Sequence, residues 1–337
     1  MGSVIPLKKS ANSAYLDLKN LLDGKLEAVE KLINTKLNSE VDLIKKMSDY
    51  HLNSGGKRIR ALLTMGSAKL GGYVNGKRDI NLSACVELIH SATLLHDDVI
   101  DESEIRRGNK TANTIWGNQS SILVGDYLLS RCFEMMVEDG DLEVLKLLSS
   151  TSSKIAQGEV LQLQYKGEAD LLEENYIKII NLKTAALFAA ATKVGACISG
   201  QDKKKKDALE SYGKNLGLAF QIADDALDYY SKETIFGKEI GKDFYEGKTT
   251  LPLIIIFQRA NSEERNFLLE ILKKEKRNED DFSETLALIN KYNAVQESLK
   301  RAEYFVNVSR DALGIFDDNQ DKMTLQNLTG FSLNRSF

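Results

Sequence analysis

The scarcity of proline is the feature of this 337-residue chain that most restricts its fold. Only two prolines occur, Pro6 and Pro252, so the long stretch between them lacks the residue that most strongly breaks helices. Apolar residues recur there at three- and four-residue steps, which is the spacing of one helical face. Runs that alternate apolar and polar residues between turn signals, as strands require, are not evident. The sequence therefore predicts an all-α protein.

The helical pattern covers most of the chain. One apolar stripe runs over residues 18–37, and the others cover residues 59–70, 82–99, 120–137, 142–164, 176–199, 207–230 and 252–272. Glycine-containing turns separate these stripes, and neither a low-complexity linker nor a repeat divides the chain. We expect a single domain over residues 1–337, with peripheral helices before residue 55 and after residue 252.

Composition and charge exclude several classes of function. The net charge is −4 with acidic and basic residues mixed along the chain, so a nucleic-acid partner is not expected. The basic run at residues 203–206 is predicted to be a solvated loop. The N-terminal segment has no apolar core of signal-peptide length, and the apolar run at residues 251–257 is far below the ~20 residues that span a bilayer. Because Cys85, Cys132 and Cys197 show no metal-binding spacing, we expect reduced thiols and a cytoplasmic protein without a transmembrane segment.

Two acidic motifs carry the chemistry. The segment HDDVID at residues 96–101 places Asp97 and Asp101 four residues apart, on one face of a helix. The same spacing returns in DDALD at residues 224–228. One such motif is a weak signal, but two that each follow a long apolar stripe indicate facing helices that direct carboxylates into one cavity. Oxygen ligands suit Mg²⁺, which keeps several waters and bridges carboxylates to substrate phosphates.

Basic residues near these motifs supply the opposite charge. They are Lys57 and Arg60 after the glycine pair at residues 55–56, Arg106 and Arg107 after the first motif, and Lys238 and Lys248 after the second. Arginine grips phosphate oxygens bidentately, and lysine acts as a compact point charge. Surface ion pairing would explain any one of these residues. Their shared arrangement suits two diphosphate groups in one cavity.

Together these segments resemble the trans-isoprenyl diphosphate synthases, and within them the medium- to long-chain polyprenyl diphosphate synthases of the octaprenyl and decaprenyl type. The matching segments, in family order, are GGKRIR at residues 55–60, IHSATLLHDDVID at 89–101, RRG at 106–108, VGDYLL at 124–129, KT at 183–184, QIADD at 221–225 and residues 237–252. Ala61 stands where proline is frequent. The resemblance implies the isoprenoid synthase fold, a helical bundle around a deep central cavity. It also implies a homodimer, for which the apolar stripe at residues 120–137 is a plausible interface.

The resemblance implies roles for individual residues. Three Mg²⁺ ions per site would be held by Asp97, Asp101 and Asp224, supported by Asp98, Asp225 and Asp228. The allylic diphosphate would contact Arg106, Lys183, Thr184, Gln221, Lys238 and Lys248. Isopentenyl diphosphate would contact Lys57, Arg60, His90 and Arg107, although His90 could instead be a core histidine. The residues expected to act in catalysis are Asp97, Asp98, Asp101, Arg106, Lys183, Asp224 and Lys238.

The implied reaction is ionisation of an allylic diphosphate, attack by the isopentenyl double bond and loss of a proton, repeated in trans additions. Farnesyl or geranyl diphosphate is the expected primer. Short-chain members close the cavity with an aromatic residue where this chain has Ala92 and Thr93, followed one turn away by Ile89. We therefore expect a product of C40–C50, the size of ubiquinone-type side chains. Phe133 or Met136 could form a deeper floor or simply pack in the core. A transient membrane contact is expected only when the product is released.

Three other functions stay open. A shorter-chain synthase would stop at C15–C20. A catalytically silent partner subunit of a hetero-oligomeric synthase would usually have lost an acidic motif, and both are complete here. A class I terpene cyclase would share the first motif, but it would not need the second motif or the cations for a second diphosphate.

Overall fold

The computed structural model describes residues 11–167, 171–230, 240–274 and 276–333. These residues form helices and one short two-stranded hairpin, which confirms the predicted all-α class. The first half contains α1 (Ala11–Leu21), α2 (Lys25–Lys36), α3 (Asp42–Asn53), α4 (Ile59–Leu70), α5 (Arg78–Ile100), β1 (Ile105–Arg106), β2 (Asn109–Lys110), α6 (Ala112–Trp116), α7 (Asn118–Asp139) and α8 (Leu142–Gln164). The second half contains α9 (Glu173–Ile180), the π-helical turn η1 (Asn181–Ala185), α10 (Ala186–Ile198), α11 (Lys203–Leu227), α12 (Lys242–Tyr245), α13 (Leu251–Arg259), α14 (Ser262–Leu272), α15 (Glu279–Lys291), α16 (Ala294–Ala312), the 3₁₀ turn η2 (Leu313–Ile315), α17 (Gln320–Leu328) and the 3₁₀ turn η3 (Thr329–Ser332).

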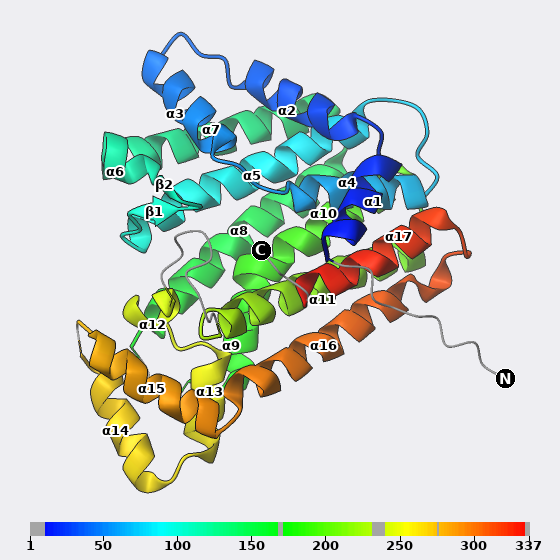
Figure 1. Ribbon diagram of the computed structural model, residues 1–337. Helices are drawn as coiled ribbons and strands as arrows, with labels where there is room; N and C mark the ends of the chain where they lie inside the picture. Colours follow the sequence, from blue (N-terminus) through cyan, green and yellow to red (C-terminus); the bar gives the residue numbers. More distant parts are fainter. Residues whose placement is uncertain (1–10, 168–170, 231–239, 275, 334–337) are drawn as a thin grey trace, which may run out of the picture.

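The two helices that carry the acidic motifs, α5 and α11, run through the middle of the molecule (Figure 1). Helix α10 packs against α4 and α11, and α5 packs against α4 and α7. Helices α2 and α3 lie on the side of α5 and α7, whereas α16 and α17 lie on the side of α11 (Figure 1). Helices α13, α14 and α15 lie together at one end. The acidic motifs are thus borne by interior helices, where their positions are fixed by packing.

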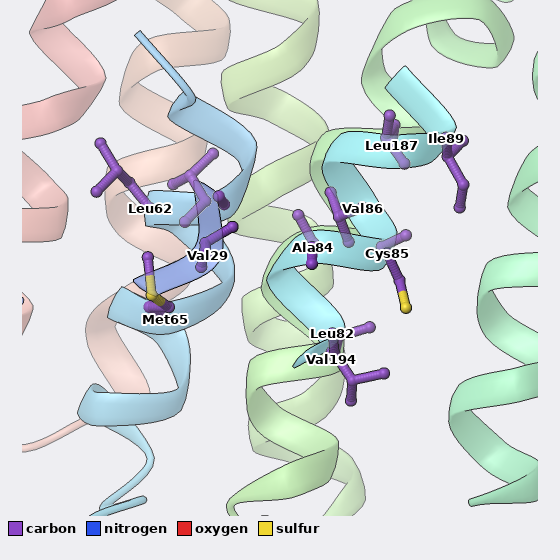
Figure 2. Packing of buried hydrophobic residues seen from close by; sticks show 14 of the residues in the cluster. Val29, Leu62, Met65, Leu82, Ala84, Cys85, Val86, Ile89, Leu187 and Val194 are labelled. Carbon is purple, nitrogen blue, oxygen red and sulfur yellow. The ribbon is translucent and has the colours of Figure 1, made fainter. Parts of the chain in front are cut away.

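Two hydrophobic clusters hold the helices together. The first joins α1, α2, α4, α5, α7, α8 and α10, and Figure 2 shows part of it, with Leu62 of α4, Val86 of α5 and Leu187 of α10 among the packed side chains. The second joins α9, α11 and α13 to α16. Helix α11 contributes Leu216 to the first cluster and Ile222 to the second. Each large apolar side chain buried in this way contributes roughly 1.5–3 kcal/mol.

Some predicted helices are interrupted. The stripe at residues 18–37 is divided into α1 and α2 by a turn in which Asp23 and Gly24 have φ angles of 37° and 71°. The stripe at residues 252–272 is divided after α13, because Asn261 forms a capping box with Glu264 that begins α14. The stripe at residues 176–199 contains the π-helical turn η1. The apolar spacing continues across each interruption, so periodicity alone does not reveal it.

The prediction of a solvated loop at residues 203–206 is wrong. These lysines form the first turn of α11, because the Asp202 carboxylate accepts a hydrogen bond from the backbone N–H of Lys205 at 2.9 Å. Such a cap typically contributes about 1 kcal/mol and offsets the unfavourable placement of cations at a helix N-terminus. Lys206 Nζ also donates to Glu143 Oε2 at 2.7 Å.

Two further observations concern the chain as a whole. Among the described residues, no helix combines the length and the apolar character needed to cross a membrane. Cys85, Cys132 and Cys197 are buried free thiols.

Candidate active site

A cavity of about 2080 Å³ opens among the helices. Asp97 and Asp101 reach it from the C-terminal end of α5, and Asp224 and Asp228 reach it from the C-terminal end of α11. The structure therefore brings the two acidic motifs, more than a hundred residues apart in the chain, to one cavity. We call the wall formed by these residues the acidic side.

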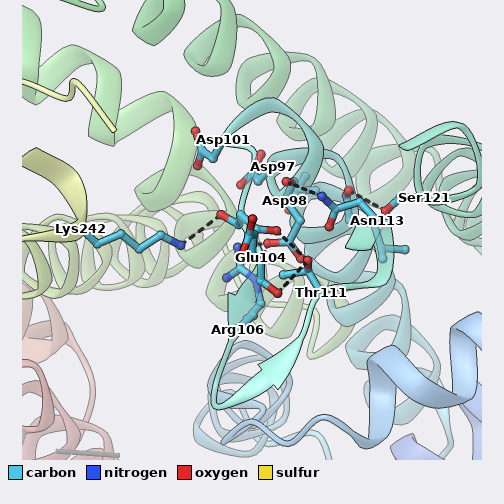
Figure 3. A network of polar contacts seen from close by, with 12 residues as sticks. Asp97, Asp98, Asp101, Glu104, Arg106, Thr111, Asn113, Ser121 and Lys242 are labelled. Carbon is cyan, nitrogen blue, oxygen red and sulfur yellow. Dashed lines mark hydrogen bonds and ion pairs between the residues drawn. The ribbon is translucent and has the colours of Figure 1, made fainter. Parts of the chain in front are cut away.

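The three carboxylates of the first motif do not share one role. Asp97 and Asp101 lie together, and Asp98 is turned towards the hairpin (Figure 3). Arg106 of β1 donates to Asp98 Oδ1 from Nε at 2.8 Å and from Nη2 at 2.7 Å. Burial raises the pKa of Asp98, and the nearby Arg106 opposes that effect. Asp98 thus supports the site by fixing Arg106, which itself lines the cavity.

Lys183 reaches the acidic side from the π-helical turn η1. Its Nζ donates to Glu159 Oε2 at 2.7 Å and to Gln162 Oε1 at 2.8 Å, and it lies 3.9 Å from Asp97 Oδ2. Helix α8 approaches the turn closely at Gly158, where an added Cβ would lie 2.7 Å from the backbone N of Lys183. The sequence analysis did not find Glu159 and Gln162, because neither lies in the segments that carry the family resemblance.

Lys248 joins the acidic side from the segment after α12. Its Nζ lies 2.9 Å from Asp101 Oδ2 and 2.7 Å from Glu246 Oε2. Burial opposes the charge of Lys248, but Asp101, Asp243 and Glu246 together raise its pKa well above the ordinary value. Burial would likewise raise the pKa of Asp101, yet Lys248 and other lysines hold it below the usual range. Both groups are therefore charged at neutral pH.

A third lysine connects α12 to the segment after the first motif. Lys242 Nζ donates to Ser103 Oγ at 3.0 Å (Figure 3), and both residues line the cavity. Asp228, at the end of α11, accepts a hydrogen bond at Oδ2 from the backbone N–H of Asp243 at 2.9 Å. These contacts tie α12 to the second acidic motif and to the segment that follows the first. Lys238, a predicted substrate contact, lies outside the described residues.

The second acidic motif contains a hydrogen-bonded chain. Asp224 lines the cavity, whereas Asp225 is buried and accepts hydrogen bonds from Tyr176 Oη at 2.6 Å and Gln221 Nε2 at 2.7 Å. Thr184 Oγ1 donates to Gln221 Oε1 at 2.8 Å. Burial raises the pKa of Asp225 to about 7, although both of its donors oppose the shift. Asp225 therefore orients Gln221 towards the cavity from behind.

Lys57, Arg60, His90 and Arg107 line the same cavity, and we call this part the basic side. The loop before α4 approaches the hairpin closely. Gly56 has a φ of 140°, and an added Cβ there would lie 2.7 Å from Arg107 Nη1, while the Arg107 guanidinium donates to the carbonyl of Gly55. A side chain at residue 56 would displace Arg107.

Aromatic rings lie beside two of these cations. Lys57 Nζ is 4.6 Å from the centroid of the Phe331 ring, and Arg60 Cζ is 4.5 Å from that of Phe188. Burial, followed by the charges of Arg60 and its neighbouring arginines, lowers the pKa of His90 well below its ordinary value. His90 therefore faces the cavity as a neutral imidazole.

Helix α3 supports the basic side from behind, a role that the sequence analysis did not predict. Tyr50 Oη donates to the carbonyl of Lys110 in the hairpin at 2.7 Å, and Arg58 Nη2 donates to the carbonyl of Leu52 at 2.6 Å. Burial and then the charges of Arg106 and its neighbours lower the pKa of His51 to about 3. A neutral histidine thus lies beside the arginine cluster.

The predicted chain-length residues divide into two groups. Thr93 lines the cavity. Ala92, Ile89 and Met136 are packed in the core, each at most 1% exposed, and Phe133 is 42% exposed on α7. Within one chain, Phe133 therefore does not form the floor that was considered for it. The apolar lining of the cavity includes Leu94, Ile155 and Phe220 instead.

The acidic side has the properties of a metal site. Two buried carboxylate oxygens, Asp97 Oδ1 and Glu159 Oε1, have no hydrogen-bond partner among the residues that the structure describes, an arrangement that costs energy unless a cation or water compensates it. Within the described ranges, no three acidic, histidine or cysteine side chains converge into a ready-made ion site. A site with few protein ligands fits Mg²⁺, because water and substrate phosphate complete much of the octahedral shell of that ion.

Comparison with known proteins decides the family. The polyprenyl synthetase family model matches residues 41–289. The chain belongs to the polyprenyl synthetase family. It is 34% identical over 331 residues to octaprenyl diphosphate synthase of Haemophilus influenzae, covering 98% of this chain and all of that one.

Solved structures agree. A decaprenyl diphosphate synthase from Rhodobacter capsulatus superposes with a TM-score of 0.91 at 39% identity, covering 95% of this chain and 99% of that one. A polyprenyl synthase from Caulobacter crescentus, complexed with calcium and isoprenyl diphosphate, gives a TM-score of 0.92 at 40% identity, covering 98% and 99%.

Family membership confirms several predictions. The fold is that of the isoprenoid synthases, and the chain is a trans-prenyltransferase of the long-chain polyprenyl synthase type. Polyprenyl synthases condense isopentenyl and allylic diphosphates and are generally Mg²⁺-dependent. The terpene cyclase alternative is thereby removed.

Proposed function

We propose that this polyprenyl synthase makes an all-trans product of C40–C50, as a ubiquinone-type side chain, by extending farnesyl or geranyl diphosphate. The observation that carries the proposal is the cavity itself. Its lining includes residues of both acidic motifs together with the cations Lys57, Arg60 and Arg107. Two diphosphates need such an arrangement, and relatives of similar sequence are octaprenyl and decaprenyl diphosphate synthases.

The acidic side would hold the cofactor. We assign three Mg²⁺ ions per site to Asp97, Asp101 and Asp224, with Asp98, Asp225 and Asp228 acting through the groups they fix. When bound, the ions would neutralise charge on the diphosphate that departs from the allylic substrate. The unpaired oxygen of Asp97 supports this assignment.

The cations of the acidic side would assist the departure of the diphosphate. The bond between the allylic carbon and the diphosphate oxygen breaks, and both electrons leave with oxygen. Lys183 and Lys248 are already held in place by carboxylates, so their charges are preorganised for the developing anion. Arg106, Thr184, Gln221 and Lys238 complete the proposed contacts to this diphosphate.

The basic side would hold isopentenyl diphosphate through Lys57, Arg60, His90 and Arg107. The isopentenyl double bond then attacks the allylic cation to form a carbon–carbon bond, and a proton leaves the adjacent carbon. We assign that proton to the released diphosphate, which is the base formed nearest to it. Apolar residues such as Leu94 and Phe220 line the cavity and limit the water that would trap the cation.

Product analysis tests the chain length. The purified protein would be incubated with Mg²⁺, radiolabelled isopentenyl diphosphate and farnesyl diphosphate, and the dephosphorylated products sized by reverse-phase chromatography. A ladder that ends at C40–C50 supports the proposal. A stop at C15–C20 overturns the long-chain assignment, and no incorporation with any primer favours the silent partner subunit.

A variant sharpens this test. Thr93→Phe places an aromatic ring in the cavity wall and should shorten the product to about C20 or less, whereas Thr93→Ser should not. Unchanged product length in Thr93→Phe would show that the growing chain does not pass Thr93.

We also propose that the chain acts as one domain in a homodimer formed through α7. Leu123 and Val137 on this helix are each 66% exposed, and Phe133 lies on it as well. A double Leu123→Glu, Val137→Glu variant should sediment as a monomer, and a dimer of that variant would exclude this interface. The free thiols fit a cytoplasmic enzyme, with membrane contact only at product release.

A further inference from the structure

The 3₁₀ turn η3 brings a residue from near the C-terminus to the cavity. Phe331 lines the cavity and is only 4% exposed. Its ring lies 4.6 Å from Lys57 Nζ, and the Tyr15 ring of α1 lies 6.3 Å from it, centroid to centroid. Turn η3 packs against α1, α11, α16 and α17. Three segments that are far apart in the sequence therefore meet at Phe331.

Arg60, three residues after Lys57 and in the first turn of α4, has a similar neighbour. Its guanidinium lies 4.5 Å from the Phe188 ring centroid, and Phe188 is itself packed against Phe220 at 5.4 Å. Two cations of the basic side are thus placed over aromatic faces. An aromatic face attracts a cation through its quadrupole, and it carries no net negative charge that would compete with a diphosphate for that cation.

Lys57 follows a glycine pair in the loop before α4. Gly55 and Gly56 have φ angles of 84° and 140°, which are accessible chiefly to glycine. The flexible four-carbon side chain of Lys57 can adopt many rotamers. A fixed ring beside the ammonium group restricts those rotamers before substrate arrives, which lowers the entropic cost of binding.

We propose that Phe331 is a positioning residue for isopentenyl diphosphate, whose ring holds the Lys57 ammonium group in the orientation that binds the diphosphate. The inference rests on the proposed assignment of Lys57 to this substrate. The diphosphate of isopentenyl diphosphate does not depart; it remains on the product. Contacts to it strengthen the ground state and the transition state alike, so they act on KM more than on kcat.

Steady-state kinetics of Phe331→Leu provide the test. The variant keeps an apolar side chain but loses the aromatic face. We expect the KM for isopentenyl diphosphate to rise roughly three- to tenfold, with kcat and the KM for farnesyl diphosphate changed less than about twofold. Phe331→Tyr keeps the face and should restore the KM. A residue with only a structural role would not give this selectivity.

Phe316→Leu is the matched control. Phe316 is 6% exposed, and its ring centroid lies 5.5 Å from Lys205 Nζ. It therefore also has a cation beside its ring, but it is not part of the cavity wall described above. The control should lose comparable thermal stability and leave both KM values unchanged. If Phe331→Leu unfolds at the assay temperature, Phe331→Met fills a similar volume and carries the same expectation.

Lys57→Gln separates the two proposals. If Lys57→Gln leaves the KM for isopentenyl diphosphate unchanged, the assignment of Lys57 fails. If it raises that KM but Phe331→Leu does not, only the positioning role of Phe331 is overturned. In the double variant, Phe331→Leu should add nothing to Lys57→Gln. Suppose instead that Phe331→Leu raises the KM for isopentenyl diphosphate as much in the Lys57→Gln background as it does in the wild-type background. Phe331 would then act independently of Lys57, which also overturns the proposal.

Discussion

The two sides of the cavity place different kinds of neighbour beside their cations. On the acidic side, Lys183 lies 2.7 Å from a Glu159 oxygen and Lys248 lies 2.9 Å from an Asp101 oxygen. On the basic side, Lys57 and Arg60 each lie over an aromatic ring. Carboxylate pairing strengthens and fixes a charge, whereas an aromatic face orients one with a weaker attraction.

This difference matches the fates of the two diphosphates in the proposed reaction. The allylic diphosphate gains charge as it leaves, so the groups around it must be fixed before the transition state forms. Isopentenyl diphosphate keeps its charge and only has to be bound and released. Burial raises the pKa of Glu159 to about 7 on the acidic side, although Lys183 opposes it. Burial, followed by the charges of the arginines, lowers the pKa of His90 on the basic side.

Removing a carboxylate of the acidic side should have the largest effect. Asp97→Ala and Asp224→Ala should each lower kcat by roughly a thousandfold or more, because the ions that neutralise the leaving group lose a ligand. Circular dichroism should show an intact helical fold. Asp207→Ala, an exposed residue on the same helix as Asp224, should be fully active. Rates like those of the wild type in either cavity variant would disprove the metal-site assignment.

A pair of lysine substitutions tests the comparison directly. Lys183→Gln should lower kcat about a hundredfold, because its charge assists only the departing diphosphate. Lys57→Gln should instead raise the KM for isopentenyl diphosphate about ten- to a hundredfold and change kcat much less. Steady-state kinetics with each substrate varied in turn would measure both. If both variants lost activity mainly in kcat, the two sides would not differ as we infer.

The smallest effect concerns the pH dependence of stability. The folded protein keeps His51 neutral with its pKa lowered to about 3, whereas the unfolded residue titrates near 6.5. The unfolded chain therefore binds more protons between these values, so this contribution is complete above about pH 6.5 and is lost as the pH falls. The loss should be about 1.4 kcal/mol at pH 5.5.

The replacement His51→Gln isolates that contribution. Urea unfolding at pH 7.5 and pH 5.5 should show a smaller acid-induced loss of stability in the variant, by about 1.4 kcal/mol. Equal losses in variant and wild type would mean that burial and the neighbouring arginines do not hold His51 neutral.

Much of the fold could be predicted because helices are local. The apolar spacing and the lack of proline predicted helices over four stripes. Helices α5, α7, α8 and α11 lie at those positions in the structure. The interruptions at Asp23 and at η1 were not predictable, because the apolar spacing continues through them. The loop predicted at residues 203–206 failed for a related reason. The single cap at Asp202 outweighed the unfavourable charge of the lysines that follow it.

The sequence alone determined which residues of the chain carry the reactive charges. Asp97 and Asp101 share a face because helical geometry places residues i and i+4 together, and the order of the motifs identified the family. Only the tertiary structure decided what holds those charges. Glu159 and Gln162 reach Lys183 from α8, His51 lies behind Arg106 from α3, and Phe331 reaches Lys57 from η3. These contacts join segments up to 274 residues apart. They arise from helix packing, so the sequence analysis found no periodic pattern or motif around either partner that predicted them.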